Sequence, residues 1–231
     1  MPNARPAALV TGATGGMGSA IVRDLASTHD VIAVGRNADA LAALARETGA
    51  TAWELDITDF AAVAERLAAL LRLDVLVHAA ARGGSLSVET ATPSDWAEHF
   101  ALNVTAPAEL TRLALPRLRA AEGTVVFIGS GAGTRPVPGS AVYTATKHAL
   151  RGLADVLRID EEPHRVRVVT LAPGQTDTAM LRANIPAASY AAERYIRPAS
   201  VASTVRFVVD APADVQLTDI AVRPRQEIAR L

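Results

Sequence analysis

Short apolar runs alternate along the chain with longer segments whose apolar residues recur every three or four positions. The runs predict buried strands at residues 7–10, 31–34, 51–55, 74–81, 124–128, 166–171 and 215–222. The periodic segments predict helices at residues 19–27, 38–47, 60–72, about 92–120, 141–160 and from about 199 onward. The helix near 92–120 contains Pro107 and Pro116, so we expect it to be kinked.

Strands that alternate with helices at this spacing are typical of an α/β protein with a parallel sheet. We therefore expect a single doubly wound, Rossmann-type domain over residues 1–231, with a seven-stranded parallel sheet and helices on both faces. In such sheets, ligands bind outside the carboxyl ends of the strands. The functional residues are therefore expected in the segments that follow the strands.

Composition excludes several classes of function. Half of the 231 residues are hydrophobic, a fifth are charged and the formal net charge is −1, so the chain has no field that attracts nucleic acid. It has no cysteine, which excludes disulfides, thiolate nucleophiles and cysteine metal sites, and we expect no metal. No apolar run is long enough to span a membrane, and the first ten residues leave no room for a signal peptide. We therefore expect a cytoplasmic protein with no membrane or nucleic-acid partner.

The first predicted strand leads into a glycine-rich turn, Thr11-Gly12-Ala13-Thr14-Gly15-Gly16-Met17-Gly18, that opens the first helix. Backbone N–H groups of such a turn can approach a phosphate, and the helix N-terminus adds a positive partial charge. A P-loop would end in Gly-Lys-Ser/Thr, whereas here Gly18 is followed by Ser19. The turn therefore favours a dinucleotide site, with a merely tight connection as the alternative.

Two charged residues follow the next two strands. Arg36 comes directly after the second strand, with no acid beside it, and can pair with the 2′-phosphate of NADP. A surface arginine, or one stacked on the adenine, is the alternative. Asp56 follows the third strand and could accept a hydrogen bond from an adenine amino group, while Thr58 or Asp59 could cap the next helix.

Lys147 is the only lysine of the chain, since the other 22 of its 23 basic residues are arginines. It stands four residues after Tyr143, one of three tyrosines, and positions i and i+4 share one face of a helix. An ammonium held near a tyrosine favours the phenolate, which indicates acid–base chemistry. An exposed helix lysine beside a packed tyrosine explains the spacing equally well.

Together these motifs resemble the short-chain dehydrogenase/reductase family over essentially the whole chain. Thr11-Gly12-x-x-x-Gly16-x-Gly18 is similar to its cofactor loop, and Pro173-Gly174-Gln175-Thr176-Asp177-Thr178 to its segment over the nicotinamide. The resemblance implies a catalytic set in matching order and spacing: Asn103, Ser130, Tyr143 and Lys147. It also implies cofactor contacts from Gly12, Thr14, Gly16, Met17, Gly18, Arg36, Asp56, Ala79, Ala80, Tyr143, Lys147, Pro173, Gly174, Thr176 and Thr178.

One segment departs from the family pattern. The Asn-Asn-Ala-Gly signature after the fourth strand is replaced by His78-Ala79-Ala80-Ala81, which removes two amides and a glycine beside the cofactor. We therefore expect the local backbone to differ. His78 lies on an apolar strand, and we expect it to be packed and hydrogen-bonded rather than catalytic.

The resemblance implies an NADP(H)-dependent oxidoreductase, with NAD less favoured, that transfers a hydride between the nicotinamide and a small, mostly neutral carbonyl or alcohol. Tyr143 would be the general acid/base, Ser130 would bind the substrate oxygen and Asn103 would position a water. Lys147 would hold the nicotinamide ribose and lower the pKa of Tyr143. Bringing a tyrosine pKa from about 10 to 7 takes roughly 4 kcal/mol. An ammonium about 5 Å away supplies roughly 3 kcal/mol, so we expect Lys147 to provide most of the shift.

The substrate site is expected at the segment 175–197. The candidate pocket residues are mostly apolar, which suits a neutral substrate: Val137, Gln175, Thr176, Met180, Leu181, Ile185 and Tyr190. Simple packing of a lid is an equally good interpretation. Because the segment is short, we expect an open or mobile site.

Two other functions compete with the reductase. A hydrolase using Ser130 would need a Gly-x-Ser-x-Gly turn, but the sequence reads Ile128-Gly129-Ser130-Gly131. A sensor that binds NADP(H) without turnover has its only support in the altered segment that begins at His78, and binding alone does not need Tyr143. The resemblance also implies a homodimer or homotetramer formed through the long helices near 94–120 and 141–160.

Overall fold

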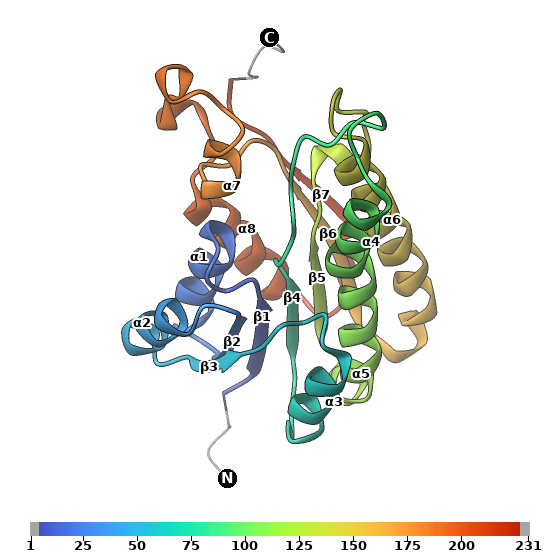
Figure 1. Cartoon of the computed structure of the whole chain (residues 1–231). Helices are drawn as coiled ribbons and strands as arrows, with labels where there is room; N and C mark the ends of the chain where they lie inside the picture. Colours follow the sequence, from blue (N-terminus) through green and yellow to red (C-terminus); the bar gives the residue numbers. More distant parts are fainter. Residues whose placement is uncertain (1–4, 227–231) are drawn as a thin grey trace.

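Seven parallel strands form one sheet in the computed structural model, which describes residues 5–226 (Figure 1). Their order across the sheet is β3-β2-β1-β4-β5-β6-β7. The strands are β1 (Ala7–Thr11), β2 (Asp30–Gly35), β3 (Thr51–Glu54), β4 (Val75–His78), β5 (Thr124–Ile128), β6 (Arg167–Pro173) and β7 (Asp219–Val222). The predicted seven-stranded parallel sheet is confirmed.

Helices cover both faces of this sheet (Figure 1). On one face lie α1 (Gly16–Leu25), α2 (Ala38–Thr48) and α8 (Pro198–Val209). On the other lie α3 (Phe60–Ala68), α4 (Pro93–Phe100), α5 (Ala106–Ala121) and α6 (Ala141–Asp160). A short helix, α7 (Ala179–Arg182), stands beyond the carboxyl ends of the strands, above the N-terminus of α1 in Figure 1.

The alternation of side chains along each strand divides the core between these two layers. On β5, Val126 belongs to the cluster that packs against α1 and α8, while Val125 and Phe127 belong to the cluster that packs against α5 and α6. All five residues of β5 are buried, which explains why the strand is apolar without alternation. Each buried aliphatic or aromatic side chain of this kind contributes about 1.5–3 kcal/mol. The two clusters therefore fix the sheet between its helices.

The order in which strands are added to the sheet changes side at β1. Strands β2 and β3 extend from one side of β1, and strands β4 to β7 extend from the other. The connections that leave the carboxyl ends of β1 and β4 therefore go to opposite sides, which opens a crevice between them. Doubly wound sheets bind their ligands at this point.

Several predicted elements differ in extent from the structure. The strand predicted at 74–81 ends at His78, and the helix predicted at 19–27 spans Gly16–Leu25. The helix predicted at 60–72 ends at Ala68, and Leu71 is 97% exposed. The single helix predicted near 92–120 is two α-helices joined by a π-helical turn, Ala101–Thr105. Pro107 lies in the first turn of α5, directly after the π-helical turn. The seventh strand begins at Asp219 rather than at residue 215.

Candidate active site

The glycine turn after β1 is too tight for side chains. Gly12 has a φ of 65°, and a Cβ on it would lie 2.7 Å from the Cα of Ala80. A Cβ on Gly18 would lie 2.1 Å from the carbonyl oxygen of Gly12. Only glycine fits at these two positions, and the backbone N–H groups at the start of α1 are left accessible beside them. The turn is therefore shaped to receive an anionic group such as a pyrophosphate.

Thr11 anchors the segment that departs from the family signature. Its hydroxyl accepts hydrogen bonds from the backbone N–H groups of Ala79 and Ala80, both at 3.2 Å, and it donates to the carbonyl of Val77 at 3.4 Å. These bonds join the glycine turn to the end of β4 without any asparagine. Sequence reasoning named Thr11 as the first residue of the glycine-rich motif but gave its hydroxyl no role, although a buried hydroxyl at the end of an apolar strand is a usable signal.

Arg36 and Asp56 face each other at the ends of β2 and β3. The nearest guanidinium nitrogen lies 3.7 Å from Oδ2 of Asp56, and the Arg36 side chain is 74% exposed. Oδ1 of Asp56 accepts hydrogen bonds from the backbone N–H and the hydroxyl of Thr58, at 2.9 and 2.7 Å. The Thr58 N–H is the main reason why the pKa of Asp56 lies below its usual range. Asp59, not Thr58, caps α3, because its carboxylate accepts from the N–H of Ala62.

Asn103 lies within the π-helical turn and is almost completely buried. Its Oδ1 accepts from the N–H of Arg82 at 2.7 Å, while its Nδ2 donates to the Arg82 carbonyl at 2.9 Å and to the Thr146 hydroxyl at 3.1 Å. Thr146 in turn donates to the carbonyl of Tyr143 at 2.8 Å. One side chain thus connects the segment after β4 with the helix that carries the catalytic candidates. π-helical turns are frequent at functional sites.

Ser130, Tyr143 and Lys147 come together at the carboxyl end of β5. The Ser130 hydroxyl accepts from the N–H of Ala132 at 3.1 Å and is also hydrogen-bonded to Tyr143. The Lys147 ammonium donates to the carbonyl of Ile128 at 2.9 Å and lies 5.7 Å from the centre of the Tyr143 ring. The helical spacing expected for this pair is therefore realised on α6, which spans the predicted residues.

Burial shifts the pKa values of this pair in opposite directions. Lys147 is 3% exposed, and the loss of solvent lowers its pKa to about 8. Among the described residues, it forms no salt bridge. Burial raises the pKa of Tyr143, and the hydrogen bond with Ser130 only partly opposes this effect. The expected downward shift of the tyrosine pKa is therefore not present in the protein alone, because the phenolate would lose more solvation than its neighbours return.

The segment that follows β6 folds over the crevice as a lid, defined here as residues 175–197. Pro173 ends β6, and the N–H of Gly174 donates to the carbonyl of Val222 on β7. Thr176 is buried and donates to the Gly174 carbonyl at 3.1 Å, whereas Thr178 caps α7. These predicted cofactor residues therefore lie between the sheet and α7.

The predicted pocket residues are only partly brought together. Met180 reaches the segment after β4, since a Cβ on Gly83 would lie 2.8 Å from its sulfur. Leu181 and Ile185 are half-buried, while the side chain of Gln175 is exposed. Val137 lies on the loop before α6, where it is 42% exposed and its carbonyl accepts from the Ser140 N–H.

Arg223 is a charged residue near the site that sequence reasoning missed. It directly follows β7, and its guanidinium lies 3.6 Å from where a Cβ on Gly131, next to Ser130, would stand. The rule that places functional groups after the strands, applied to the last strand, would have found it.

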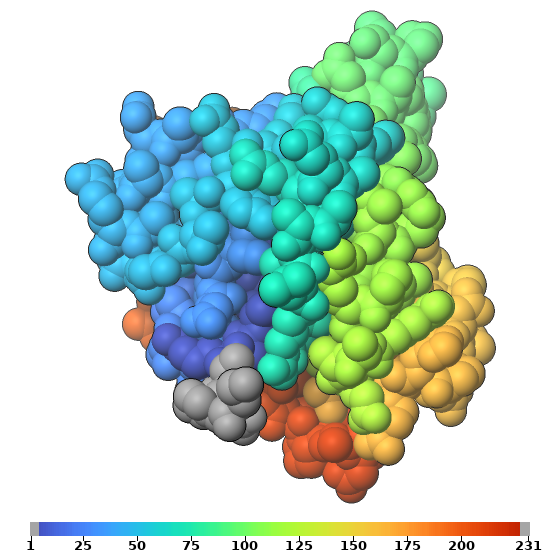
Figure 2. Space-filling model, turned by 90° about the horizontal axis from the view of Figure 1, so that it is seen from below, coloured from blue at the N-terminus to red at the C-terminus, as the bar shows by residue number. Residues whose placement is uncertain are grey.

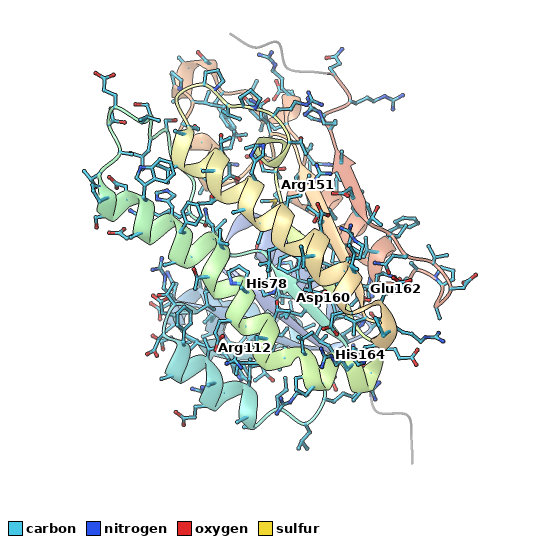
Figure 3. The ribbon with its side chains drawn as sticks, turned by 90° about the vertical axis from the view of Figure 1, so that its right-hand side faces the viewer. His78, Arg112, Arg151, Asp160, Glu162 and His164 are labelled. Carbon is cyan, nitrogen blue, oxygen red and sulfur yellow. The ribbon has the colours of Figure 1, made fainter. Side chains whose placement is uncertain are left out.

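His78 is packed and hydrogen-bonded, as predicted. It is 2% exposed, its Nε2 lies 2.8 Å from the hydroxyl of Thr111, and its ring stacks on Phe127 at 4.8 Å. Burial lowers its pKa to about 3, so the ring is neutral at physiological pH. Figure 3 shows His78 beneath α5 and α6, on the core side of these helices.

Other features of the described residues do not compete with this site. No group of three or more His, Asp or Glu side chains is arranged to hold a metal, and none of the described helices could cross a membrane. A cavity of about 450 Å³ lies at the opposite end of the sheet, where the strands begin. This is the end of the molecule that is seen in Figure 2. The charged side chains in the wall of this cavity have partners within the protein. Asp74 pairs with Arg72, Glu122 pairs with Arg165, and Arg167 donates to backbone carbonyls.

Comparisons with known proteins agree with this arrangement. The family model described as short chain dehydrogenase matches residues 6–188. An uncharacterized oxidoreductase of Mycobacterium tuberculosis is 36% identical over 95% of this chain and 91% of its own length. The NADP-dependent 3-hydroxy acid dehydrogenase of Escherichia coli is 32% identical over 94% of each chain. The crystal structure of a metagenomic short-chain oxidoreductase in complex with NADP has a TM-score of 0.83 at 31% identity, and covers 96% of this chain and 99% of that one.

The family model covers most of the chain, and the relatives match it nearly from end to end. Members of this family are oxidoreductases that interconvert alcohols and carbonyl compounds with NAD(P). The chain therefore belongs to the short-chain dehydrogenase family.

Proposed function

We propose that this protein is an NADP(H)-dependent oxidoreductase of small carbonyl compounds and their alcohols, with Tyr143 as its general acid/base. The observation that carries the proposal is the buried Lys147 ammonium, 5.7 Å from the Tyr143 ring and without an acidic partner among the described residues. A buried cation without a counter-ion is costly for folding, so its retention favours a role in catalysis.

We assign the substrate oxygen to the hydroxyls of Tyr143 and Ser130, which are hydrogen-bonded to each other. In the reduction direction, Ser130 hydrogen-bonds the carbonyl oxygen and Tyr143 donates its proton to it; in the oxidation direction, Tyr143 takes the proton from the alcohol. The bound nicotinamide supplies or accepts the hydride. Asn103 and Thr146 act through position, because they join the segment at Arg82 to the turn of α6 that carries Tyr143.

Lys147 opposes the effect of burial on the tyrosine. An ammonium 5.7 Å from the ring, at an effective dielectric near 20, favours the phenolate by about 3 kcal/mol. The positive charge of an oxidised nicotinamide acts in the same direction. We therefore propose that the pKa of Tyr143 comes near neutrality only when the cofactor is bound, rather than through Lys147 alone.

The residues at the adenosine end suit NADP. At the glycine turn, the absence of a Cβ leaves the space that a dinucleotide pyrophosphate needs to approach the backbone closely. Arg36 is mostly exposed and only loosely paired, so its guanidinium is available for a 2′-phosphate. The metagenomic relative in complex with NADP and the NADP-dependent relative from Escherichia coli support this choice.

The substrate is proposed to be a small, mostly neutral carbonyl or alcohol that lies between Tyr143 and the lid. Met180 and Leu181 offer apolar contacts on α7, and Val137 and Gln175 stay candidates for its outer wall. We also propose that the protein is a homodimer or homotetramer that associates through α5 and α6, which run side by side in Figure 3. Val156 and Ile159 on α6 are 59% and 70% exposed, which supports an interface there.

The decisive experiment measures the consumption of NADPH with a panel of aldehydes, ketones and keto acids. Tyr143→Phe keeps the ring and should lower kcat by about 10²–10⁴-fold with unchanged circular dichroism. Near-full activity of Tyr143→Phe would contradict the assignment. Tight NADPH binding without turnover over the whole panel would instead favour a sensor. Tighter binding of NADH than of NADPH would contradict the cofactor assignment.

A further inference from the structure

The first few and the last few residues of the lid are hydrogen-bonded to each other. The N–H of Ile196 donates to the carbonyl of Gln175 at 2.9 Å, and the N–H of Asp177 donates to the carbonyl of Ile196 at 2.9 Å. These bonds form a small parallel bridge between Thr176 and Ile196. The two ends of the lid are therefore joined to each other, and the residues between them form one closed loop.

Within the lid, two side chains donate hydrogen bonds to one oxygen atom of a third. Oδ1 of Asp177 accepts from Nε and Nη2 of Arg182, at 2.9 and 2.6 Å, and from the hydroxyl of Tyr190 at 2.6 Å. The Arg182 guanidinium also lies over the Tyr190 ring, 5.6 Å from its centre, and that ring packs on Tyr195 at 4.9 Å. We name Asp177, Arg182 and Tyr190 the lid clip.

The lid clip differs from an ordinary surface ion pair, which contributes little to stability. The side chain of Asp177 is only 19% exposed, although that of Arg182 is 59% exposed. The hydroxyl of Tyr190 is the main reason why the pKa of Asp177 is lowered, ahead of Arg182. The clip thus joins the base of the lid, the end of α7 and the distal part of the lid.

Two glycines outside the lid provide the surfaces on which it rests. A Cβ on Gly16 would lie 2.9 Å from the methyl group of Thr178, and a Cβ on Gly83 would lie 2.8 Å from the sulfur of Met180. The base of the lid therefore contacts the glycine turn, and α7 contacts the segment after β4. The folded lid spans the crevice between the two.

We propose that the lid clip consists of positioning residues that hold the lid in this shape. Asp177 stands between Thr176 and Thr178, so the clip fixes the two threonines proposed to contact the nicotinamide; in this respect the inference rests on the proposed function. Loss of the clip leaves Tyr143, Lys147 and Ser130 untouched. It therefore acts on cofactor retention and on KM more than on the proton transfer.

The test uses three variants of the full-length protein, Asp177→Asn, Tyr190→Phe and Arg182→Gln. Glu109→Gln is the matched control, because Glu109 pairs with Arg112 on α5 through the same two guanidinium nitrogens, at 2.7 and 2.6 Å. Tyr195→Phe is the second control, since it removes a hydroxyl from the ring that packs on Tyr190 without touching Asp177. Circular dichroism and thermal unfolding verify that each variant is folded.

Two readouts report on the clip. The first is the rate at which NADPH dissociates, measured by stopped-flow fluorescence, which we expect to rise about tenfold in Asp177→Asn and about threefold in Tyr190→Phe. The second is the rate of trypsin cleavage after Arg194 without cofactor, which should rise in all three clip variants and in neither control. The double variant of Asp177 and Tyr190 should be no more affected than Asp177→Asn, because the bond that Tyr190→Phe removes is one of the three that Asp177→Asn already disrupts.

The outcomes separate the clip from the proposed function. Cleavage and dissociation rates equal to those of Glu109→Gln would overturn the clip, even if the wild-type protein reduces carbonyl compounds. A large fall in kcat with an unchanged KM and an unchanged dissociation rate would also overturn it, because the clip would then act on the chemistry. Protection of the wild-type lid in a protein that shows no NADPH turnover would support the clip and contradict the proposed function.

Discussion

The two ends of the sheet hold their charged groups in opposite ways. At the carboxyl end, the Lys147 ammonium is buried with one backbone carbonyl as its partner and no carboxylate. At the amino end, a cavity of about 450 Å³ has several charged side chains in its wall, which are held in ion pairs or, for Arg167, by several hydrogen bonds without a carboxylate. Asp74 is bound by Arg72, Glu122 by Arg165, and Arg167 by several backbone carbonyls.

The difference shows that the volume of a cavity does not locate an active site. A paired charge is already stabilised within the protein, so it has little interaction left for a ligand. A buried charge without a counter-ion raises the free energy of the folded state, and it remains able to stabilise an opposite charge on a reacting group. We therefore propose that the amino end contributes to stability and that the carboxyl end contributes to chemistry. Substitutions at the two ends should have opposite effects.

Lys147→Met tests this contrast most strongly. The variant should lose about 10²–10³-fold in kcat, because the phenolate of Tyr143 loses its cation. It should also be more stable than the wild type at pH 7. The lowered pKa of Lys147, about 8 against an ordinary 10.5, means that the unfolded chain binds more protons between these values, so the charged lysine costs the fold roughly 3 kcal/mol below pH 8. Urea unfolding and steady-state kinetics measure the two effects.

The pH profile provides the control for this prediction. In the wild type, activity should fall above about pH 8 as Lys147 loses its proton, while Lys147→Arg should keep its charge and lose this alkaline limb. The stabilisation of Lys147→Met should shrink as the pH rises from 8 toward 10.5. A variant that is inactive and also strongly destabilised at pH 7 would contradict the proposed contrast.

His78 gives a third case for comparison, because this buried core residue is kept uncharged. Its pKa is lowered to about 3, so the unfolded chain binds more protons between pH 3 and the ordinary value of 6.5. The stability that comes from keeping the ring neutral is complete above pH 6.5 and should fall by about 2 kcal/mol at pH 5. His78→Asn should lose correspondingly less stability than the wild type between pH 7 and pH 5 in urea unfolding. Equal losses in both proteins would show that His78 is not buried as a neutral ring.

Arg167→Met tests the amino end. The guanidinium donates to the carbonyls of Val208, Ala211, Pro212 and Val215, so its removal should lower the free energy of unfolding by about 2 kcal/mol. The kcat/KM of the folded protein should not change. Arg165→Met is the matched control, because its pair with Glu122 is exposed and should cost less than about 1 kcal/mol. Reduced activity in folded Arg167→Met would give the amino end a functional role and break the comparison.

The fold could be predicted because its signals are local. The apolar run of β5 and the helical period of α6 have the bounds that the structure gives, and both elements are flanked by glycine, serine or acidic residues that end the pattern. Tyr143, Lys147 and Ser130 could be placed for the same reason, since strand ends and helix faces determine their positions. NADP and the enzyme class followed from the glycine turn and the family resemblance.

The rest depends on contacts between distant residues. The π-helical turn carries Asn103, whose side chain bonds the backbone of Arg82, 21 residues away, and no periodicity encodes such a contact. The lid clip joins Asp177 to Tyr190 within a segment that has no regular pattern. The expected pKa of Tyr143 was wrong in direction for the protein alone because the calculation used the distance to one ammonium and left out the burial of the phenol.

Arg36→Gln gives the smallest expected effect and tests a residue that is intermediate between the two ends. Arg36 is a cation at the carboxyl end that is loosely paired, 3.7 Å from Asp56 and 74% exposed, so it lies between the unpaired Lys147 and the paired arginines of the amino end. Removing it should raise the KM for NADPH about fivefold to tenfold and leave the KM for NADH unchanged, because only NADPH carries the 2′-phosphate. Arg46→Gln on α2, whose side chain donates only to a carbonyl of its own helix, is the control and should change neither value. An equal rise for both cofactors would show that Arg36 contacts the adenine rather than the phosphate, and an unchanged KM for NADPH would show that its pairing with Asp56 already satisfies it.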